Sequence, residues 1–271
     1  MANSVILAQL KREQILELLK EGKRLDGRGL EDQRPLSIDV GVIPKANGSA
    51  RVRLGDTEIV TGVKIQPDKP FPDLGDKGIL ICTAEILPLA DPNAEPGPPS
   101  EEVIELARVV DRGIRETEML DLHQLVLIEN KSVIGIFIDS SVTDADGNLF
   151  DACSYASVAA LLSCTVPKYE IKDEAPVLVE DVTSKPPVKT IPVSVTMARI
   201  GDHIIVDPSS DEEACMDARL TITTNTEGNI CAIQKGGIDG FTLEQVVRCS
   251  EIALSVGTKI RKQLEKLMQN G

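Results

Sequence analysis

Apolar and polar positions alternate along much of the first half of the chain, and this period of two predicts β-strands. The predicted strands cover residues 36–43, 49–55, 57–65, 78–87, 125–129 and 132–142. Gly55 and Asp56 separate the second and third strands, which predicts a hairpin turn there. Apolar residues at helical spacing predict three helices in the same half. These helices cover residues 3–21, 100–119 and 151–165.

The second half repeats this pattern in a shorter form. Its predicted strands cover residues 191–200, 203–206, 217–225 and 229–235, and a long helix covers 242–268. Thr242 and Gln245 have the spacing of a capping box at the start of this helix. Strands in runs followed by helices indicate an α+β fold, with helices packed on one face of each sheet.

The same pattern divides the chain into four segments. An amino-terminal helix (1–22) precedes a first half (23–167), and a second half (191–271) ends in the carboxy-terminal helix. Between them lies a charged, proline-bearing connection (168–190), to which we assign no strand or helix. The two halves have the appearance of a duplication.

Composition narrows the class of protein. The chain has 271 residues and 42% hydrophobic residues, so it can bury a sizeable core, which excludes intrinsic disorder. Its longest apolar runs are far too short to cross a bilayer. The first residues contain no basic segment followed by an apolar one, so no secretory signal is expected. We therefore expect a cytoplasmic protein without membrane contact.

Charge and chemistry exclude several kinds of site. The net charge is −14 and aromatic residues make up 2% of the chain. A wide phosphate-tracking surface and an aromatic base-stacking platform are therefore excluded, although a small basic patch or a site shared with a partner stays open. Six cysteines without a C-x-x-C pair and two distant histidines predict reduced thiols, no metal site and no cofactor. The acidic residues between Asp207 and Asp217 are expected to form a solvated face.

One predicted helix, residues 100–119, carries a set of arginines. Its apolar stripe is formed by four residues: Val103, Ala107, Val110 and Ile114. Arg108, Arg112 and Arg115 fall together on roughly the opposite side of the helix. Three acidic residues are near enough to compensate them: Glu105, Asp111 and Glu116. Compensation by these acids and a clamp for phosphate or for a partner's carboxylates are both consistent with the pattern.

Four segments together resemble the signatures of the ribonuclease PH family. They are R-L-D-G-R (24–28), N-G-S-A-R-V-R-L-G-D-T-E-I-V-T-G-V (47–63), E-L-A-R-V-V-D-R-G-I-R (105–115) and L-F-D-A-C-S-Y-A-S-V-A-A-L (149–161). The resemblance extends from about residue 20 to the last helix. It implies a ribonuclease PH-like fold of two stacked βαβα halves, here with an extra amino-terminal helix. It also implies a ring of six PH-type units.

The chain departs from the active members of that family at the phosphate site. Active members carry D-G-G-[ST]-R, whose backbone and arginine hold the attacking phosphate. The matching stretch here, residues 146–151, reads D-G-N-L-F-D and has neither the Ser/Thr nor the Arg. Asp217 aligns with the family's catalytic Asp only with a short gap. We therefore expect no catalytic residue in this chain.

Other features resemble the non-catalytic PH-type subunits of archaeal exosome rings. These are the leading helix, the F-D-A-C-S-Y-A-S stretch and the D-P-S-S-D-E-E segment (207–213). The resemblance implies a structural, RNA-contacting subunit of a phosphorolytic 3′–5′ exoribonuclease complex. Its partners would be a catalytic PH-type subunit that alternates with it around the ring, RNA-binding cap proteins and single-stranded RNA. Arg108 and Arg112 match the helix arginines that reach RNA in such subunits, and Arg115 lies beside them.

Two alternatives stay open at this point. The chain could be an active phosphorolytic exoribonuclease in its own right, which requires a phosphate site that the sequence does not show. It could also be a pure assembly subunit, whose arginines bind only carboxylates of a partner. RNA affinity of the assembled complex, with and without Arg108, separates the second alternative from the RNA-contacting role.

Overall fold

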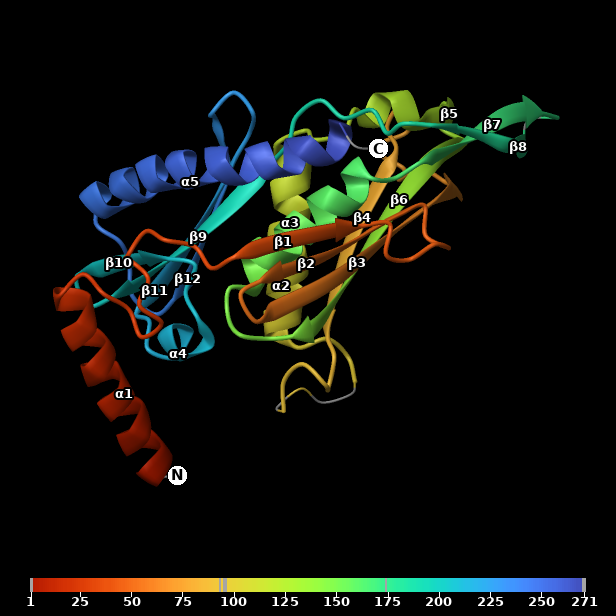
Figure 1. Ribbon diagram of the computed structural model, residues 1–271. Helices are drawn as coiled ribbons and strands as arrows, with labels where there is room; N and C mark the ends of the chain where they lie inside the picture. The colour runs from red at the N-terminus through yellow and green to blue at the C-terminus, as the bar shows by residue number, and fades with distance from the viewer. Residues whose placement is uncertain (1, 93, 95–96, 174, 270–271) are drawn as a thin grey trace.

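The alternating segments of the first half form a six-stranded sheet (Figure 1). In this computed structural model, which describes residues 2–92, 94, 97–173 and 175–269, its strands are β1 (Leu36–Val40), β2 (Gly48–Leu54), β3 (Thr57–Asp68), β4 (Ile79–Ile86), β5 (Val126–Ile128) and β6 (Ser132–Asp144). The order is β1-β2-β3-β6-β4, with β5 also paired to β6. Only the β4–β6 pair among these is parallel, and it places β4 at an edge of the sheet.

The second half contains a four-stranded antiparallel sheet with the order β10-β9-β11-β12. Its strands are β9 (Val193–Ile200), β10 (His203–Val206), β11 (Ala218–Thr224) and β12 (Ile230–Gly237), and a short helix, α4 (Ser210–Glu213), lies between β10 and β11. The long helix α5 (Leu243–Gln269) packs on β9 and β11. The predicted capping box is confirmed, because the Thr242 N–H donates to Gln245 Oε1 (2.9 Å) and the Gln245 N–H donates to Thr242 Oγ1 (3.2 Å).

A central helix, α3 (Leu149–Leu162), joins the two halves. It packs against β2 and β3 on the first side and against β9 on the second, and every residue from 149 to 161 is buried. Small side chains allow this close approach on all sides, since the helix contains four alanines and two serines. The result is the α+β architecture that the sequence predicts, with one core that runs through both halves.

The carboxy-terminal part of the first helix, α1 (Ala2–Lys20), packs on the second half (Figure 1). Ile15 and Leu19 are almost fully buried there, in a small apolar cluster. The cluster is completed by Ala198, Ile200, Ile205 and Cys215. The guanidinium of Arg12 also donates to both carboxylate oxygens of Asp217 (2.9 and 3.1 Å). The amino-terminal helix is therefore a structural part of the second half.

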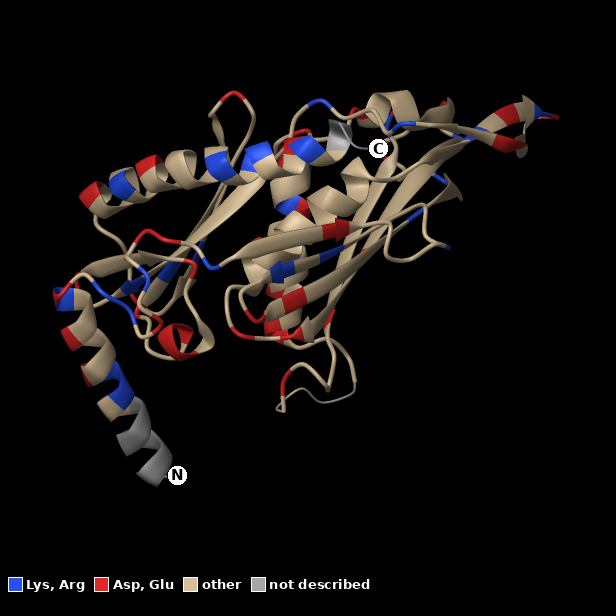
Figure 2. Ribbon diagram, viewed as in Figure 1, with Lys and Arg blue, Asp and Glu red and all other residues tan. Residues whose placement is uncertain are grey.

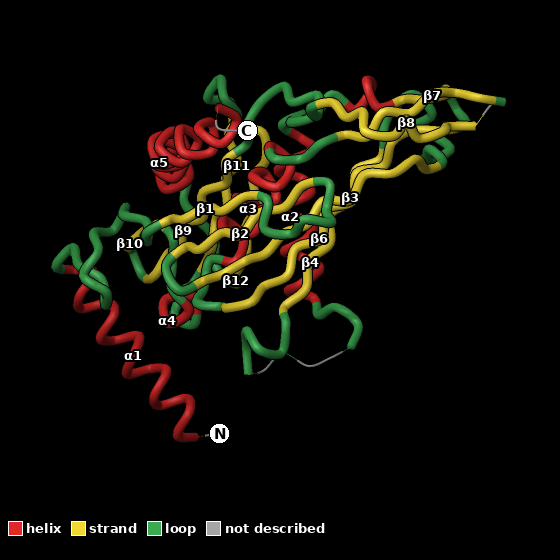
Figure 3. Tube along the Cα trace, turned by 45° about the vertical axis from the view of Figure 1, so that its right-hand side comes forward, coloured by secondary structure: helices red, strands yellow, loops and turns green. Residues whose placement is uncertain are grey.

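The connection between the halves contains an element that the sequence analysis missed. Strands β7 (Val166–Lys172) and β8 (Ala175–Ser184) pair as an antiparallel hairpin that extends away from both sheets (Figures 1 and 3). Most of its side chains are exposed on both faces. A one-sided apolar alternation, which identifies a half-buried strand, is therefore absent from this segment.

Basic and acidic residues are mixed over the surface of the protein. Figure 2 shows Lys and Arg residues interspersed with Asp and Glu over most elements. All six cysteines are free thiols. Among the described residues, no helix is long and apolar enough to cross a membrane.

Candidate functional site

The three arginines lie on helix α2 (Glu101–Glu116). Its N-cap and its buried face determine which side chains of the helix face the solvent. Ser100 caps it, with the Val103 N–H donating to the Ser100 hydroxyl (3.3 Å). The residues that it buries are Val103, Leu106, Val109, Val110, Gly113 and Ile114. Ala107, which the sequence analysis placed on the apolar stripe, is only half-buried. Leu106 and Val109 take core positions instead, because α2 packs on both β4 and α3.

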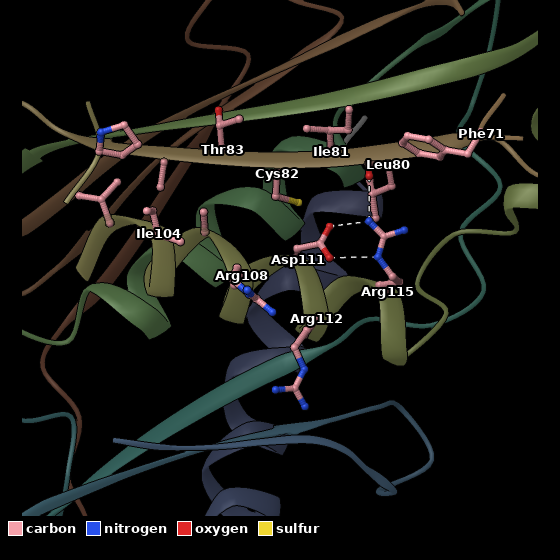
Figure 4. Close-up of a pocket in the computed structure, with 14 residues that line it drawn as sticks. Phe71, Leu80, Ile81, Cys82, Thr83, Ile104, Arg108, Asp111, Arg112 and Arg115 are labelled. Carbon is pink, nitrogen blue, oxygen red and sulfur yellow. Dashed lines mark hydrogen bonds and ion pairs between the residues drawn. The ribbon is translucent and has the colours of Figure 1, made fainter. Parts of the chain in front are cut away.

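A cleft of about 640 Å³ runs between α2 and the edge strand β4. Its floor is mostly apolar, and the arginines lie along the α2 side of it (Figure 4). Phe71, Leu80 and Ile104 are among the apolar residues that line it. Because β4 is an edge strand, the cleft opens at the side of the sheet rather than within the core.

Arg108 and Arg112 are both exposed and lie one helical turn apart. Figure 4 shows both side chains pointing away from β4. Arg112 Nη1 donates to Gln234 Oε1 (3.3 Å), and for Arg108 no hydrogen bond or ion pair is found within the described part of the chain. No carboxylate there pairs with either guanidinium. Two such arginines at i and i+4 repel each other unless an anion lies between them, so the pair is suited to bind an anion.

Arg115 differs from the other two, because a carboxylate already neutralises it. Its guanidinium contacts Asp111 at two points, with Nη2–Oδ1 at 2.7 Å and Nε–Oδ2 at 3.0 Å. Nη2 also donates to the Leu80 carbonyl on β4 (2.8 Å), which ties α2 to the sheet. Helical spacing placed Arg115 in one group with Arg108 and Arg112. The structure gives Arg115 a mainly structural set of contacts.

The segment that replaces the family's phosphate loop connects β6 to the amino terminus of α3. Asn148 adopts a left-handed conformation there (φ 49°), and its N–H donates to Glu213 Oε1 (3.0 Å). Its amide Nδ2 donates to Asp151 Oδ2 (2.9 Å) and to Asp207 Oδ1 (2.7 Å). The backbone N–H and the side-chain amide of Asn148 are thus already bound to the chain's own carboxylates.

Asp151 and Asp207 are fully buried, and Glu213 is half-buried. Burial raises the pKa of Asp151 to about 7, and burial likewise raises the pKa of Glu213 to about 7. Asp207 is fully buried beside Asn148; burial acts to raise its pKa, but the hydrogen bonds and ion pair with Arg34 outweigh burial and hold the pKa below its ordinary value. An incoming phosphate dianion would meet acidic groups here instead of a free arginine, so the segment is unsuited to hold it.

The acidic residues from Asp207 onward do not form the solvated face that the sequence analysis expected. Arg28 and Arg34 each contact the Asp207 carboxylate, at 3.1 and 2.8 Å. Arg24 Nε donates to Glu212 Oε1 (2.8 Å), and both of these side chains are buried. The arginines of the R-L-D-G-R loop therefore fasten the first half to the second through buried ion pairs.

Asp217 also has a structural role in this chain. Beyond its contact with Arg12, Asp217 Oδ2 accepts a hydrogen bond from the Gly201 N–H (2.7 Å). Burial alone raises the pKa of Asp217, but the hydrogen bonds from Arg12 and Gly201 outweigh it and hold the pKa below its ordinary value. Both carboxylate oxygens are thus occupied by groups of the chain itself.

Comparison with known proteins places this geometry in a family. A family model described as domain 1 of the 3′ exoribonuclease (ribonuclease PH) family matches residues 32–167, and the model of its domain 2 matches residues 190–256. The chain belongs to the ribonuclease PH family. The family's two domains correspond to the two sheets described above, which confirms the predicted fold class.

Relatives within the ribonuclease PH family match the chain over its full length. Exosome complex component Rrp42 of Thermococcus kodakarensis is 50% identical over 267 residues, which cover 98% of each chain. Exosome complex component Rrp42 of Pyrococcus horikoshii is 48% identical over 273 residues and covers 100% of each. A chain in a structure of the Archaeoglobus fulgidus exosome with RNA bound to the active site superimposes with a TM-score of 0.88. It is 43% identical, with 95% of this chain and 99% of that chain covered.

One residue of the site has no signal in the sequence. Gln234 lies on β12, 122 positions after Arg112, and β12 packs on α2 from the four-stranded sheet, whereas β4 packs on α2 from the six-stranded sheet. Helical periodicity identifies the arginines because they lie on one helix. A hydrogen-bond partner on a strand distant in sequence can be identified only from the packing of the two halves in the structure.

Proposed function

We propose that this chain is the non-catalytic, Rrp42-type subunit of an archaeal exosome, a phosphorolytic 3′–5′ exoribonuclease complex. In it, the chain alternates around a six-membered ring with a catalytic PH-type subunit, and RNA-binding cap proteins dock on that ring. The chain contributes scaffold and RNA-contacting arginines, and its partner contributes the phosphate site and the catalytic acid. The complex acts in the cytoplasm on single-stranded RNA.

The observation that carries this proposal is the exposed, unpaired arginine pair Arg108 and Arg112. A guanidinium can hold a phosphate by two parallel hydrogen bonds, and two guanidinium groups one turn apart span adjacent positions of an RNA backbone. Such contacts fix the strand without reading its bases. Arg115 lies at the end of the same row, but Asp111 neutralises it and holds two of its donors, so we expect it to contribute little to RNA binding.

The carboxylates around Asn148 support the proposal that the partner subunit, and not this chain, binds the attacking phosphate. A subunit that performed phosphorolysis alone would need donors free to bind the attacking phosphate. Here the Asn148 N–H and Nδ2 are bound to Glu213, Asp151 and Asp207. The phosphate therefore has to bind in the partner subunit.

The test is RNA affinity of the assembled complex across a salt series, with Arg108 and Arg112 both replaced by Ala. Charge-assisted contacts are worth about 1.5–3 kcal/mol each, so affinity should fall about a hundredfold or more. The log–log salt slope should fall by about 0.7 for each lost phosphate contact. Lys259→Ala with Lys262→Ala on the exposed side of α5 is the matched control, because it removes the same charge elsewhere.

Two results would contradict the RNA-contacting role. If affinity and slope match the wild type while the complex stays intact, Arg108 and Arg112 do not contact RNA. If the doubly substituted complex dissociates into subunits, the arginines bind partner carboxylates, and the chain is a pure assembly subunit. The second result would support the alternative function, that of a pure assembly subunit. That alternative is favoured by one observation: no carboxylate among the described residues pairs with Arg108 or Arg112.

A further inference from the structure

Arg112 is held by a residue of the second half of the protein. Its Nη1 donates to Gln234 Oε1 at 3.3 Å, and this is the hydrogen bond found for its side chain in the described residues. Gln234 lies near the middle of β12, the edge strand of the four-stranded sheet, and is half-buried between β12 and α2. The orientation of an exposed arginine on α2 therefore depends on a strand that belongs to the other sheet.

The amide of Gln234 can have only one orientation at this place. While its oxygen accepts from Arg112, its nitrogen Nε2 donates to Glu105 Oε1 at 3.1 Å. A guanidinium can only donate and a carboxylate can only accept, so rotating the amide by 180° would oppose donor to donor and acceptor to acceptor. Glu105 and Arg112 are seven residues apart, about two turns along the same side of α2. Gln234 thus bridges two positions of one helix.

The other end of this chain of contacts is anchored in the core. Arg219 Nη2 donates to the same Glu105 Oε1 at 3.0 Å. Arg219 is only 9% exposed, and its guanidinium carbon lies 3.9 Å from the centroid of the Phe150 ring. A Cβ added at Gly236, the residue opposite Arg219 on β12, would come within 2.7 Å of Arg219 Nη2. Arg219 therefore packs closely on the Gly236 backbone and the Phe150 ring, and through it Glu105 is bound to a side chain that is itself held in the core.

We propose that Gln234 is a positioning residue, which holds the Arg112 guanidinium in the orientation that binds the RNA phosphate. This inference rests on the proposed function of Arg112. A free arginine side chain loses rotamer freedom when it binds, and a side chain already held in place loses less, so preorganisation increases affinity. Glu105 and Arg219 act behind Gln234, by fixing its amide. The network also makes the geometry of the RNA contact depend on correct packing between the two halves.

The test is a double-mutant cycle in the assembled complex, with RNA affinity as the readout. Gln234→Met keeps the side-chain length and removes both hydrogen bonds, and it should weaken RNA binding about threefold to tenfold. In a complex that already carries Arg112→Ala, the same substitution should have no effect, because the residue that it positions is gone. Gln124→Ala is the matched control: Gln124 is an exposed glutamine that bonds to Asp121, and its loss should leave affinity unchanged.

Each outcome of the cycle decides a separate point. If Arg112→Ala weakens binding and Gln234→Met does not, the positioning role is wrong and the proposed function stands. If Gln234→Met weakens binding equally in both backgrounds, Gln234 acts independently of Arg112, and the inference is again wrong. If Arg112→Ala itself has no effect, the RNA role of Arg112 is wrong, and the positioning role is wrong with it. Thermal unfolding of each complex shows whether a loss of affinity reflects misfolding, and Gln234→Asn, a smaller change, then replaces Gln234→Met.

Discussion

Both carboxylate oxygens of Asp207 accept hydrogen bonds from the guanidinium of Arg34. Nη2 lies 2.8 Å from Oδ1 and Nε lies 3.0 Å from Oδ2, and both side chains are buried. Arg34 precedes β1 in the first half and Asp207 follows β10 in the second. The pair therefore fastens the two halves together in a region where apolar packing is interrupted.

The first prediction follows from this pair. Asp207→Asn removes the charge and leaves Arg34 buried without its main counterion, which for buried pairs costs about 3–5 kcal/mol of unfolding free energy. Denaturant unfolding of the purified chain measures this loss of unfolding free energy. Glu21→Gln breaks an exposed pair with Lys23 and should change the free energy of unfolding by less than about 0.5 kcal/mol. A loss below about 1 kcal/mol for Asp207→Asn would show that the pair does not join the halves.

A second prediction concerns pH. Burial raises the pKa of Asp151 to about 7 from its ordinary value of 3.8. Between these values the unfolded chain has released the proton that the folded chain still holds, so the free energy of unfolding falls as pH rises from about 4 to about 7. The fall approaches about 1 kcal/mol per pH unit and ends above pH 7. Burial of Glu213, with its pKa of about 7, acts in the same direction.

Unfolding measured at pH 5, 6, 7 and 8 tests this sign. Asp151→Asn cannot titrate, and its side-chain oxygen can still accept from Asn148 and the Thr196 N–H, so the pH dependence should flatten. Glu213→Gln should flatten it further, because its oxygen still accepts from the Asn148 N–H. An unchanged pH dependence in both variants would mean that these carboxylates are ionised in the folded chain.

The third prediction separates Arg115 from Arg108. Arg115→Ala removes the contacts with Asp111 and Leu80, so it should lower the free energy of unfolding by about 1 kcal/mol, with a change in RNA affinity below about twofold. Arg108→Ala should leave stability unchanged within about 0.5 kcal/mol and weaken RNA binding about tenfold or more. Unfolding and RNA-binding measurements on both variants show whether Arg115 and Arg108 have different roles. An equal loss of affinity would give Arg115 the same role as Arg108.

A fourth prediction concerns the isolated chain. With RNA and inorganic phosphate it should release no nucleoside diphosphates, because carboxylates occupy the donors around Asn148. The complex with a catalytic homologue should release them under the same conditions. Release that rises in proportion to the concentration of the partner-free chain would make this subunit an enzyme in its own right.

The fifth prediction concerns assembly. In the described structure, β4 and β12 each end their sheet, and unpaired strand edges favour association with another chain. Co-expression with the catalytic homologue should therefore give an equimolar complex, measured by its mass in solution. A chain that stays monomeric beside that homologue would exclude the ring.

Local patterns in the sequence were sufficient for most of the fold. Thr242 and Gln245 predicted the start of α5 because capping depends on neighbouring residues alone. Alternating positions predicted strands such as β3, in which nearly every second residue is buried, whereas β9 and β11 are buried on both faces. The β7–β8 hairpin has exposed residues on both faces, so no such pattern marks it.

The site was predicted only in part. Helical spacing placed Arg108 and Arg112 on one side of α2, but it also grouped Arg115 with them, because spacing cannot tell which carboxylate lies close to each arginine. Contacts such as Arg34 with Asp207 join residues 173 positions apart, and only the packed structure brings them together. The same holds for Gln234 and Arg112.

The position of α1 has a consequence for synthesis of the protein. Helix α1 packs on β9, β10 and Cys215, which are synthesised well after it. Ile15 and Leu19 therefore remain uncovered until about four-fifths of the chain has been translated. During that interval this apolar face is available to chaperones or to other nascent chains, and co-translational folding of the second half is complete only when α1 packs on it.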